Sequence, residues 1–305
     1  MKNINPLIKE FIKLKLIKKK NFLKLSSQTR DKKVNVIKDK KSGVIFLEKY
    51  LTKIKYYSVF KEKDRNIDLH SKKIFSVTKI KNKGYIKTLN LEDDRRRSLQ
   101  FKKYLKNKNI LDFGCGWAGF LSFSKKYAKS CNGIEIRKNC LNFIKKKFSF
   151  IKVENNLNKF NQKFDIITMF HVLEHIPYQI ETIKKLKNKL KSKGKIIIEV
   201  PSAQDFLLSF DNLPEFKKFT FWSEHLVLHT EKSLMKILIK SGFRKIQILY
   251  FQRYNLNNHL GWFVKRKPGG HDFFKNVSDN IILKNYRDFL IRSKRTDTLI
   301  AIATK

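Results

Sequence analysis

Two acidic residues flank a glycine-rich stretch in an arrangement that suits a positively charged ligand. Asp112 stands two residues before Gly114-Cys-Gly116, and Glu135 lies at the end of the next apolar run. A glycine turn lets backbone N–H groups approach a ligand closely. A phosphate beside Asp112 would meet an unfavourable negative charge, whereas a cation would not. The position of Glu135 suits the ribose hydroxyls of a nucleoside, so these residues predict a site for a cationic nucleoside.

The same glycines leave other interpretations open. Gly114, Gly116 and Gly119 satisfy G-x-G-x-x-G, the pattern of dinucleotide-binding turns. A nicotinamide-dependent oxidoreductase is therefore one alternative, and a purely structural turn is another.

A regular alternation of strands and helices must position these residues. The sequence predicts strands at 109–113, 131–136, 150–154, 164–169 and 195–200, and helices at 117–128, 138–147 and 179–190. Two further strands are expected at Phe243–Phe251 and Thr298–Ala303. Such alternation implies a parallel, doubly wound sheet that binds ligands at the carboxyl ends of its strands.

The segment His171-Val-Leu-Glu174-His175 follows the fourth of these strands and supports two interpretations. H-x-x-E-H matches a zinc metallopeptidase signature, in which two histidines one helical turn apart hold the metal. That arrangement needs a long helix, and Pro177 disfavours helix at the preceding residue. We therefore expect no metal here. Histidine titrates near neutrality, so we take His171 as the first candidate for a catalytic base and His225 as the second, with His229 nearby.

The motifs D-F-G-C-G and G-I-E resemble the first two motifs of class I S-adenosylmethionine-dependent methyltransferases, and the resemblance extends from about Asn109 to about Tyr250. It implies an α/β fold with a Rossmann-like, doubly wound, seven-stranded sheet whose last strand is antiparallel. The segment H-V-L-E-H-I resembles small-molecule enzymes of this superfamily, including the ubiquinone O-methyltransferases. The cofactor implied is S-adenosyl-L-methionine.

The resemblance also implies roles for single residues. The glycine turn would hold the methionine part of the cofactor, Glu135 the ribose, and Asn156 the adenine edge. An Asn-rich turn of structural use is the alternative for Asn156. Phe170 and His171 would lie near the reactive methyl group. The full set of cofactor residues expected is Asp112, Gly114, Cys115, Gly116, Trp117, Glu135, Ile136, Asn156, Leu157 and Phe170.

The methyl acceptor is expected to contact the aromatic segment 201–230 and a long insertion between the last two strands. The insertion, 253–296, is predicted to be a substrate lid, since loops of this length are usually functional or have internal structure. It resembles segments of methyltransferases found with surface-polysaccharide synthesis genes, which implies a sugar unit or another small molecule as acceptor. We expect the methyl group to go to an oxygen, with nitrogen or carbon as the less favoured alternatives. Substrate residues expected are Trp222, Arg253, Tyr254, His259 and His271.

Charge raises the question of a polyanionic partner. The 305 residues carry a formal net charge of +43. Lysine supplies most of it, whereas arginine carries much of specific phosphate recognition, which favours compositional drift. The chain also lacks the proline pair that many base-modifying methyltransferases carry after the fourth strand. An RNA-binding protein or RNA methyltransferase therefore stays an alternative rather than the main hypothesis.

The remaining features of the sequence concern the domains of the chain and its expected location in the cell. We expect residues 1–90 to form a basic extension with a ribbon-like hairpin lacking cysteines, its strands at 34–37 and 44–47, and 91–305 to form the methyltransferase domain. Residues 66–106 are expected to be mostly helical, with the charged cluster 92–97 either lining the site or, as the simpler interpretation, on a solvated helix face. A further helix is expected at 231–241, capped by Thr230 and stopped by Gly242. Residues 4–25 have the pattern of an amphipathic helix, which either contacts an anionic membrane or packs on the protein itself. Three cysteines without paired spacing argue against disulfides or a zinc site. No secretory signal or spanning helix is expected, so we predict a cytoplasmic protein, with peripheral contact at the inner membrane face as an open alternative.

Overall fold

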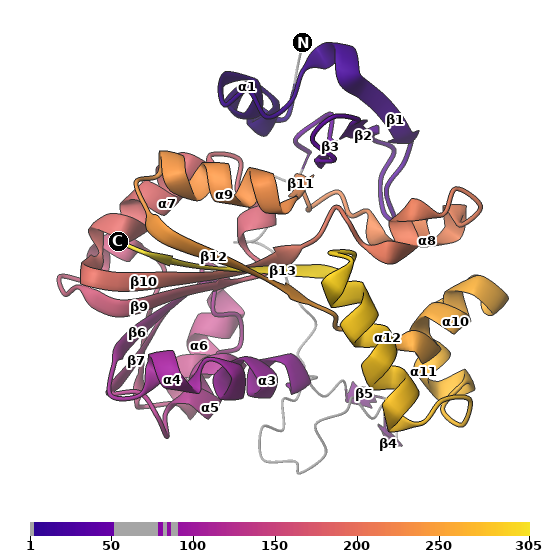
Figure 1. Ribbon diagram of the computed structural model, residues 1–305. Coiled ribbons are helices and arrows are strands. Elements are labelled where there is room, and N and C mark those ends of the chain that lie inside the picture. Colours follow the sequence, from indigo (N-terminus) through magenta and orange to yellow (C-terminus); the bar gives the residue numbers. More distant parts are fainter. Residues whose placement is uncertain (1–2, 52–78, 82–83, 87–90) are drawn as a thin grey trace. The chain divides into compact units, whose positions relative to one another are not determined.

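The computed structural model describes residues 3–51, 79–81, 84–86 and 91–305. Seven strands form one mixed sheet in the order β12-β13-β10-β9-β6-β7-β8 (Figure 1). These strands are β6 (Asn109–Phe113), β7 (Ser130–Ile134), β8 (Ile151–Glu154), β9 (Phe164–Phe170), β10 (Leu190–Pro201), β12 (Arg244–Phe251) and β13 (Thr298–Thr304).

Strand pairing confirms the predicted fold class. β6 pairs in parallel with β7 and with β9, and β7 pairs in parallel with β8. β12 and β13 pair antiparallel, with Leu249 opposite Ile300. The strands are apolar on both faces, as expected of a sheet covered on two sides: Ile110 and Leu111 are both fully buried.

The chain divides into two compact units. The first unit comprises residues 1–52, 170–187 and 196–305, and the second comprises 53–169 and 188–195. We describe each unit by itself.

The second unit contains the parallel strands and the helices between them. Its helices are α3 (Glu92–Gln100), α4 (Lys102–Leu105), α5 (Gly119–Ser124), α6 (Lys138–Lys147) and the 3-10 turn η2 (Leu157–Lys159). The boundaries of α6 are those predicted. The helix expected at 117–128 is wrong at both ends, because Ala118 has a left-handed backbone (φ 62°) and α5 ends at Ser124.

A largely helical segment was expected over 66–106, and this is wrong in part. β4 (Lys79–Lys81) and β5 (Gly84–Ile86) pair antiparallel as a short hairpin, and helix begins only at α3. Residues 66–78, 82–83 and 87–90 of that prediction lie outside the described residues.

The N-terminal part of the first unit is a short helix followed by a small sheet. Its elements are α1 (Pro6–Lys13), η1 (Lys19–Asn21), β1 (Phe22–Ser26), β2 (Val36–Asp39) and β3 (Ile45–Leu47), joined at the sheet edge by β11 (Val227–Leu228). The helix expected over 4–25 is therefore wrong beyond Lys13, and Lys15 has a left-handed backbone (φ 53°). Leu7 and Phe11 are fully buried, so the apolar face of α1 packs on the protein itself.

The predicted hairpin between β2 and β3 is present and is closed by a carboxylate. Asp39 Oδ1 accepts hydrogen bonds from the backbone N–H and the hydroxyl of Ser42, at 2.8 and 3.0 Å. Its Oδ2 accepts one from the N–H of Lys18 at 2.9 Å. These bonds hold the turn of the hairpin.

The rest of the first unit surrounds β10, β12 and β13. Its helices and 3-10 turns are η3 (Leu173–His175), α7 (Gln179–Asn188), η4 (Phe206–Ser209), α8 (Pro214–Thr220), α9 (Glu231–Lys240), α10 (Leu256–Lys265), α11 (Gly270–Phe273) and α12 (Asn280–Arg292). Thr230 caps α9 through a capping box with Ser233, and Gly242 (φ 83°) follows its end, as predicted.

The insertion 253–296 has internal structure, with α10, α11 and α12 side by side (Figure 1). Gly261 of α10 lies against Gly270 of α11, and neither position has room for a Cβ atom. No helix in the described part of the chain combines the length and apolar character needed to cross a bilayer.

Candidate active site

The glycine turn after β6 has backbone angles that glycine adopts readily and other residues rarely do. Gly114 and Gly116 have φ of 80° and 56°, a conformation that favours glycine. The N–H groups of Gly114 and Cys115 both donate to the carbonyl of Ile134, at 2.8 and 2.9 Å. Those two amides are thus already bonded, whereas Gly116 and Trp117 have no backbone partner within the described residues. A ligand is therefore expected to meet the turn at Gly116-Trp117.

Cys115 itself faces the interior. A Cβ atom at Gly133 would stand 2.6 Å from Cys115 Sγ, so the thiol fills the space that Gly133 leaves on β7. Burial raises the pKa of this thiol well above its usual value. The predicted contact of Cys115 with a cofactor is therefore confined to its backbone.

Asp112 is a buried carboxyl group with a short hydrogen bond to the neighbouring strand. Its Oδ1 accepts from Thr168 Oγ1 at 2.6 Å, across the β6–β9 pair in which the two residues are in register. Only 4% of Asp112 is exposed. Burial raises its pKa to about 7, against the lowering effect of the Thr168 bond. A carboxylate that holds its proton this tightly gains from a cationic partner.

Glu135 follows β7 and is held by the residues after it. Its Oε1 accepts from the N–H groups of Ile136 and Arg137, and its Oε2 pairs with the Arg137 guanidinium at 3.2 Å. The same guanidinium stands 3.3 Å from where a Cβ of Gly116 would be. Arg137, which the sequence did not suggest, thus spans the space between the glycine turn and Glu135.

The other predicted cofactor residues stand in the same unit. Asn156 precedes η2, and its Oδ1 accepts from the N–H of Asn158, so its Nδ2 is the group left to donate to a base. Trp117 packs edge-on against Phe143, with ring centroids 5.3 Å apart. Ile136 and Leu157 are partly exposed. Phe170, the last residue of β9, is also partly exposed but belongs to the first unit.

The charged cluster at the start of α3 is more buried than a solvated helix face would be. Only 8% of Arg97 is exposed, and its guanidinium lies 3.5 Å from Asp94. The Asp94 carboxylate occupies the space beside Gly119. These two charges act on Asp112 in opposite directions. A solvated face, the simpler interpretation of the sequence, is wrong for Arg97.

The first unit contains a cavity of about 410 Å³ that brings the predicted acceptor residues together. Five substrate candidates and both base candidates line it, from segments far apart in the sequence: His171, Trp222, His225, Arg253, Tyr254, His259 and His271. Aromatic rings of Phe216, Phe219 and Trp262 complete one side. Arg30 lies over the rings of Phe219 and Trp222, 4.1 and 4.6 Å from their centroids.

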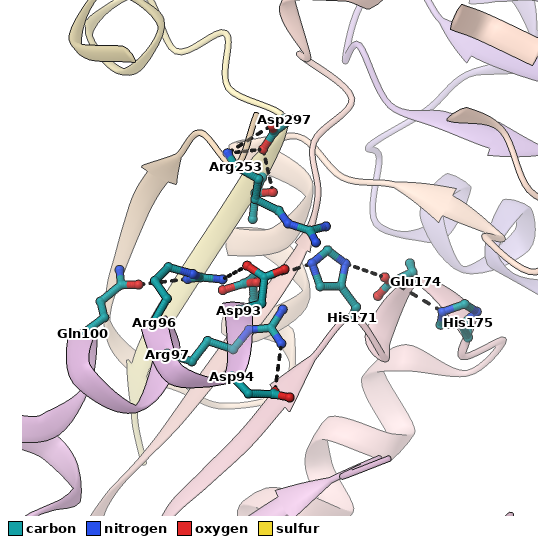
Figure 2. A network of polar contacts seen from close by, with 12 residues as sticks. Asp93, Asp94, Arg96, Arg97, Gln100, His171, Glu174, His175, Arg253 and Asp297 are labelled. Atoms are coloured by element: carbon teal, nitrogen blue, oxygen red, sulfur yellow. Dashed lines mark hydrogen bonds and ion pairs between the residues drawn. The ribbon is translucent and has the colours of Figure 1, made fainter. Parts of the chain in front are cut away.

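Acidic groups that the sequence did not suggest also line this cavity. Asp297 accepts hydrogen bonds from the N–H groups of Arg253 and Tyr254, each at 3.1 Å (Figure 2). Burial and the negative charge of Asp297 raise the pKa of Asp205 to about 8. Carboxyl groups and Arg253 in an aromatic wall supply both the donors and the acceptors that hydroxyl groups require.

His171 is held between two glutamates. Its Nδ1 is 3.2 Å from Glu174 Oε1 (Figure 2). Its Nε2 is 3.4 Å from Glu199 Oε1. Burial acts to lower the pKa of His171, but the bonds to both glutamates outweigh this and raise it. Its backbone is left-handed (φ 53°), and a quarter of the side chain is exposed. Because η3 spans only Leu173–His175, the two histidines of H-x-x-E-H do not share a helix.

The other histidines differ in their surroundings. Burial lowers the pKa of His225 to about 3, which makes this ring a weak proton acceptor. His229 is fully buried and contacts Gln179 and Ser233 with its two nitrogens, at 3.2 and 3.1 Å, so its role is structural. His259 also contacts a neighbour with each ring nitrogen, Gln252 with Nε2 and Tyr286 with Nδ1. Its side chain lines the cavity.

Comparison with known proteins gives the class of this site. A family model described as a methyltransferase domain matches residues 87–248, which is more than half of the chain. The chain belongs to this family of methyltransferases. The match confirms the predicted class I, S-adenosylmethionine-dependent methyltransferase, and it decides against the nicotinamide oxidoreductase that the glycine pattern had left open.

Individual relatives of this methyltransferase are similar over shorter stretches. The ubiquinone biosynthesis O-methyltransferase of Coxiella burnetii is 30% identical over 123 residues, which cover 37% of this chain and 52% of that protein. The tRNA U34 carboxymethyltransferase of Aliarcobacter butzleri is 30% identical over 105 residues, a third of each chain. The chain thus spans about half the length of the first of these relatives and about a third of the second. An S-adenosylmethionine-dependent methyltransferase structure from Archaeoglobus fulgidus is 20% identical, covers 70% of this chain and 94% of its own, and has a TM-score of 0.49.

Proposed function

We propose that this methyltransferase transfers the methyl group of S-adenosylmethionine to a hydroxyl group of a small ring-shaped acceptor, such as a sugar unit or a phenol. The observation that carries the proposal is the cavity of the first unit, where aromatic walls stand beside Arg253, His171 and two carboxyl groups. Aromatic faces hold the apolar side of a ring, and the polar groups bind its hydroxyls. The oxygen-methylating relative from Coxiella burnetii supports an oxygen acceptor.

The donor site is proposed in the second unit. Asp112 would face the positive charge of the donor, Glu135 the ribose hydroxyls, Asn156 and Leu157 the adenine, and the Gly116-Trp117 amides the amino-acid part. The fit rests on Asp112, because a buried carboxyl group with a pKa near 7 is stabilised in its charged form by a nearby cation. S-adenosylmethionine supplies an activated methyl group with a good leaving group, so much of the rate enhancement comes from positioning.

His171 is the proposed base for the acceptor proton. Its ring lines the cavity, and a quarter of its side chain is exposed. Glu174 at Nδ1 would fix the ring in one orientation, as a carboxylate does for a catalytic histidine.

The experiment that tests the function supplies labelled S-adenosylmethionine and a cell extract to the purified protein, then fractionates the products. We expect the label in a low-molecular-weight or sugar fraction, as a methyl ether that survives mild base. Label in the RNA fraction would support the nucleic-acid alternative instead, and label in an amine would contradict the oxygen acceptor. No transfer to any fraction, despite measurable cofactor binding, would contradict the proposed acceptor class.

A further inference from the structure

A cluster of possible metal ligands lies beside the cavity, within the first unit. One carboxylate oxygen of Glu174 and one ring nitrogen each of His175 and His225 all lie within 4.8 Å of one another. Glu174 and His175 belong to η3, whereas His225 comes from the turn before β11. The His175 and His225 rings are edge-on, with centroids 4.9 Å apart.

The carboxylate of Glu174 is incompletely bonded. Its side chain is fully buried, and Oε1 faces His171 at 3.2 Å. Within the described residues its Oε2 has no hydrogen-bond partner. An unpartnered carboxylate oxygen in a protein interior is costly, and a bound cation is one way to compensate it.

The orientation of His175 is the one expected of a metal ligand. Its Nδ1 is 3.0 Å from the backbone carbonyl of Glu224, which can only accept a hydrogen bond. In the neutral ring, a proton on Nδ1 leaves the lone pair on Nε2, which lies 3.9 Å from Glu174 Oε1. Metal-bound histidines are commonly held in this way, with the second nitrogen donating to a carbonyl or carboxylate.

We propose that Glu174, His175 and His225 bind one divalent transition-metal ion of the zinc class at the edge of the cavity. Two imidazoles and one carboxylate suit such ions, whereas Mg²⁺ and Ca²⁺ prefer oxygen ligands. Three protein ligands leave a coordination position open, and His225 places the site at the cavity wall. The H-x-x-E-H motif is then used in part, with His225 in the place that a metallopeptidase gives to the first histidine.

The role of the ion rests on the proposed function. A bound ion would lower the pKa of an acceptor hydroxyl that coordinates to it. The acceptor oxygen then attacks the methyl carbon of S-adenosylmethionine, so that a C–O bond forms and the C–S bond breaks with its electrons remaining on sulfur. The hydroxyl proton passes to His171. The products are a methyl ether, S-adenosylhomocysteine and one proton carried by the base.

The test is metal binding to the tag-free, full-length protein after treatment with a chelator. Titration with Zn²⁺ alone, followed by calorimetry, should give one ion per chain, and Co²⁺ alone should give visible absorption bands typical of nitrogen and oxygen ligands. Glu174→Gln and His225→Gln should each weaken Zn²⁺ binding more than about hundredfold, beyond the effect of changing a residue that only supports a ligand. Glu224→Gln and His271→Gln are the matched controls and should keep the affinity.

Affinity for S-adenosylhomocysteine is measured on every variant, because it reports folding and the donor site separately. The site is supported if the unmodified chain and the two controls bind one Zn²⁺ ion per chain and the two ligand variants do not. Binding below one ion per chain, or equal in Glu174→Gln and the unmodified chain, overturns it. If S-adenosylhomocysteine binds and Zn²⁺ does not, the result contradicts the metal site and leaves the proposed function unaffected. If Zn²⁺ binds and no methyl acceptor is found, the proposed function fails while the site stands.

Discussion

Thr168 donates a 2.6 Å hydrogen bond to Asp112 across the pairing of β9 with β6. This contact occupies one oxygen of a buried carboxyl group. It also ties Asp112, the proposed partner of the donor's charge, to β9, whose last residue, Phe170, immediately precedes His171 in the chain.

The raised pKa of Asp112 predicts that S-adenosylmethionine affinity depends on pH. Below about 7 the folded protein holds a proton on Asp112, and a bound cation must displace it. Affinity should therefore rise about tenfold between pH 6 and pH 8 and level off above the pKa. Calorimetric titration at several pH values measures this.

Two comparisons isolate the carboxyl group. S-adenosylhomocysteine has the same amino group but no charged sulfur, so its affinity should change less over this range. Asp112→Asn should bind S-adenosylmethionine weakly, with little dependence on pH. Equal pH profiles for the variant and the unmodified chain would exclude Asp112 as the group that meets the donor's charge.

Glu135→Gln should weaken S-adenosylmethionine and S-adenosylhomocysteine alike, because both carry the same ribose. Loss of charge-assisted hydrogen bonds predicts a decrease of roughly tenfold to hundredfold. Glu154, at the end of the neighbouring strand β8, pairs with Lys159 at 3.4 Å and offers a matched acid. Glu154→Gln should keep the affinity, and an equal loss in both variants would argue against a specific ribose contact.

His171 and His229 should respond differently to replacement by alanine. His171→Ala should lower kcat by about a hundredfold or more, the usual range for loss of a general base, while cofactor affinity changes little. His229→Ala should instead lower the free energy of unfolding by roughly 1–3 kcal/mol, since Gln179 and Ser233 lose a partner in the interior. Turnover assays and chemical denaturation of both variants separate the two roles, and a His171→Ala enzyme with full kcat would remove it as the base.

Trp222 should matter for the acceptor and not for the donor. Its ring is 36% exposed and lines the cavity beside Arg30. Trp222→Ala should raise KM for the acceptor several-fold, corresponding to about 1 kcal/mol of lost ring contact. Trp222→Phe keeps an aromatic face and should restore most of the affinity. An unchanged KM in the alanine variant would place the acceptor elsewhere.

The sequence predicted the positions of the seven strands and some helix boundaries because these depend on local pattern. The bounds of α6 and the capped start of α9 follow from apolar spacing and from Thr230. The left-handed backbone of Ala118 was missed, since alanine has no local preference for that conformation. The short N-terminal helix was missed because lysine and apolar residues continue its pattern past Lys13.

The sequence predicted which residue types make up the candidate sites, but not which residues contact one another there. Acids, glycines and histidines at the ends of strands were identified as candidates from their spacing. The partners that define their chemistry come from distant segments: Thr168 for Asp112, and His225 for His175. Nothing in local sequence places these pairs together, because they depend on which strands are neighbours and on where the loops return.

Asp297 holds the segment between β12 and β13 at its base, since it accepts from the amides of Arg253 and Tyr254 and from the Gln252 side chain. The chain leaves β12 and re-enters β13 at one carboxylate. We therefore expect the pairing of β12 with β13 to tolerate insertions and deletions within α10 to α12, so that the acceptor-facing segment can be exchanged without rebuilding the sheet.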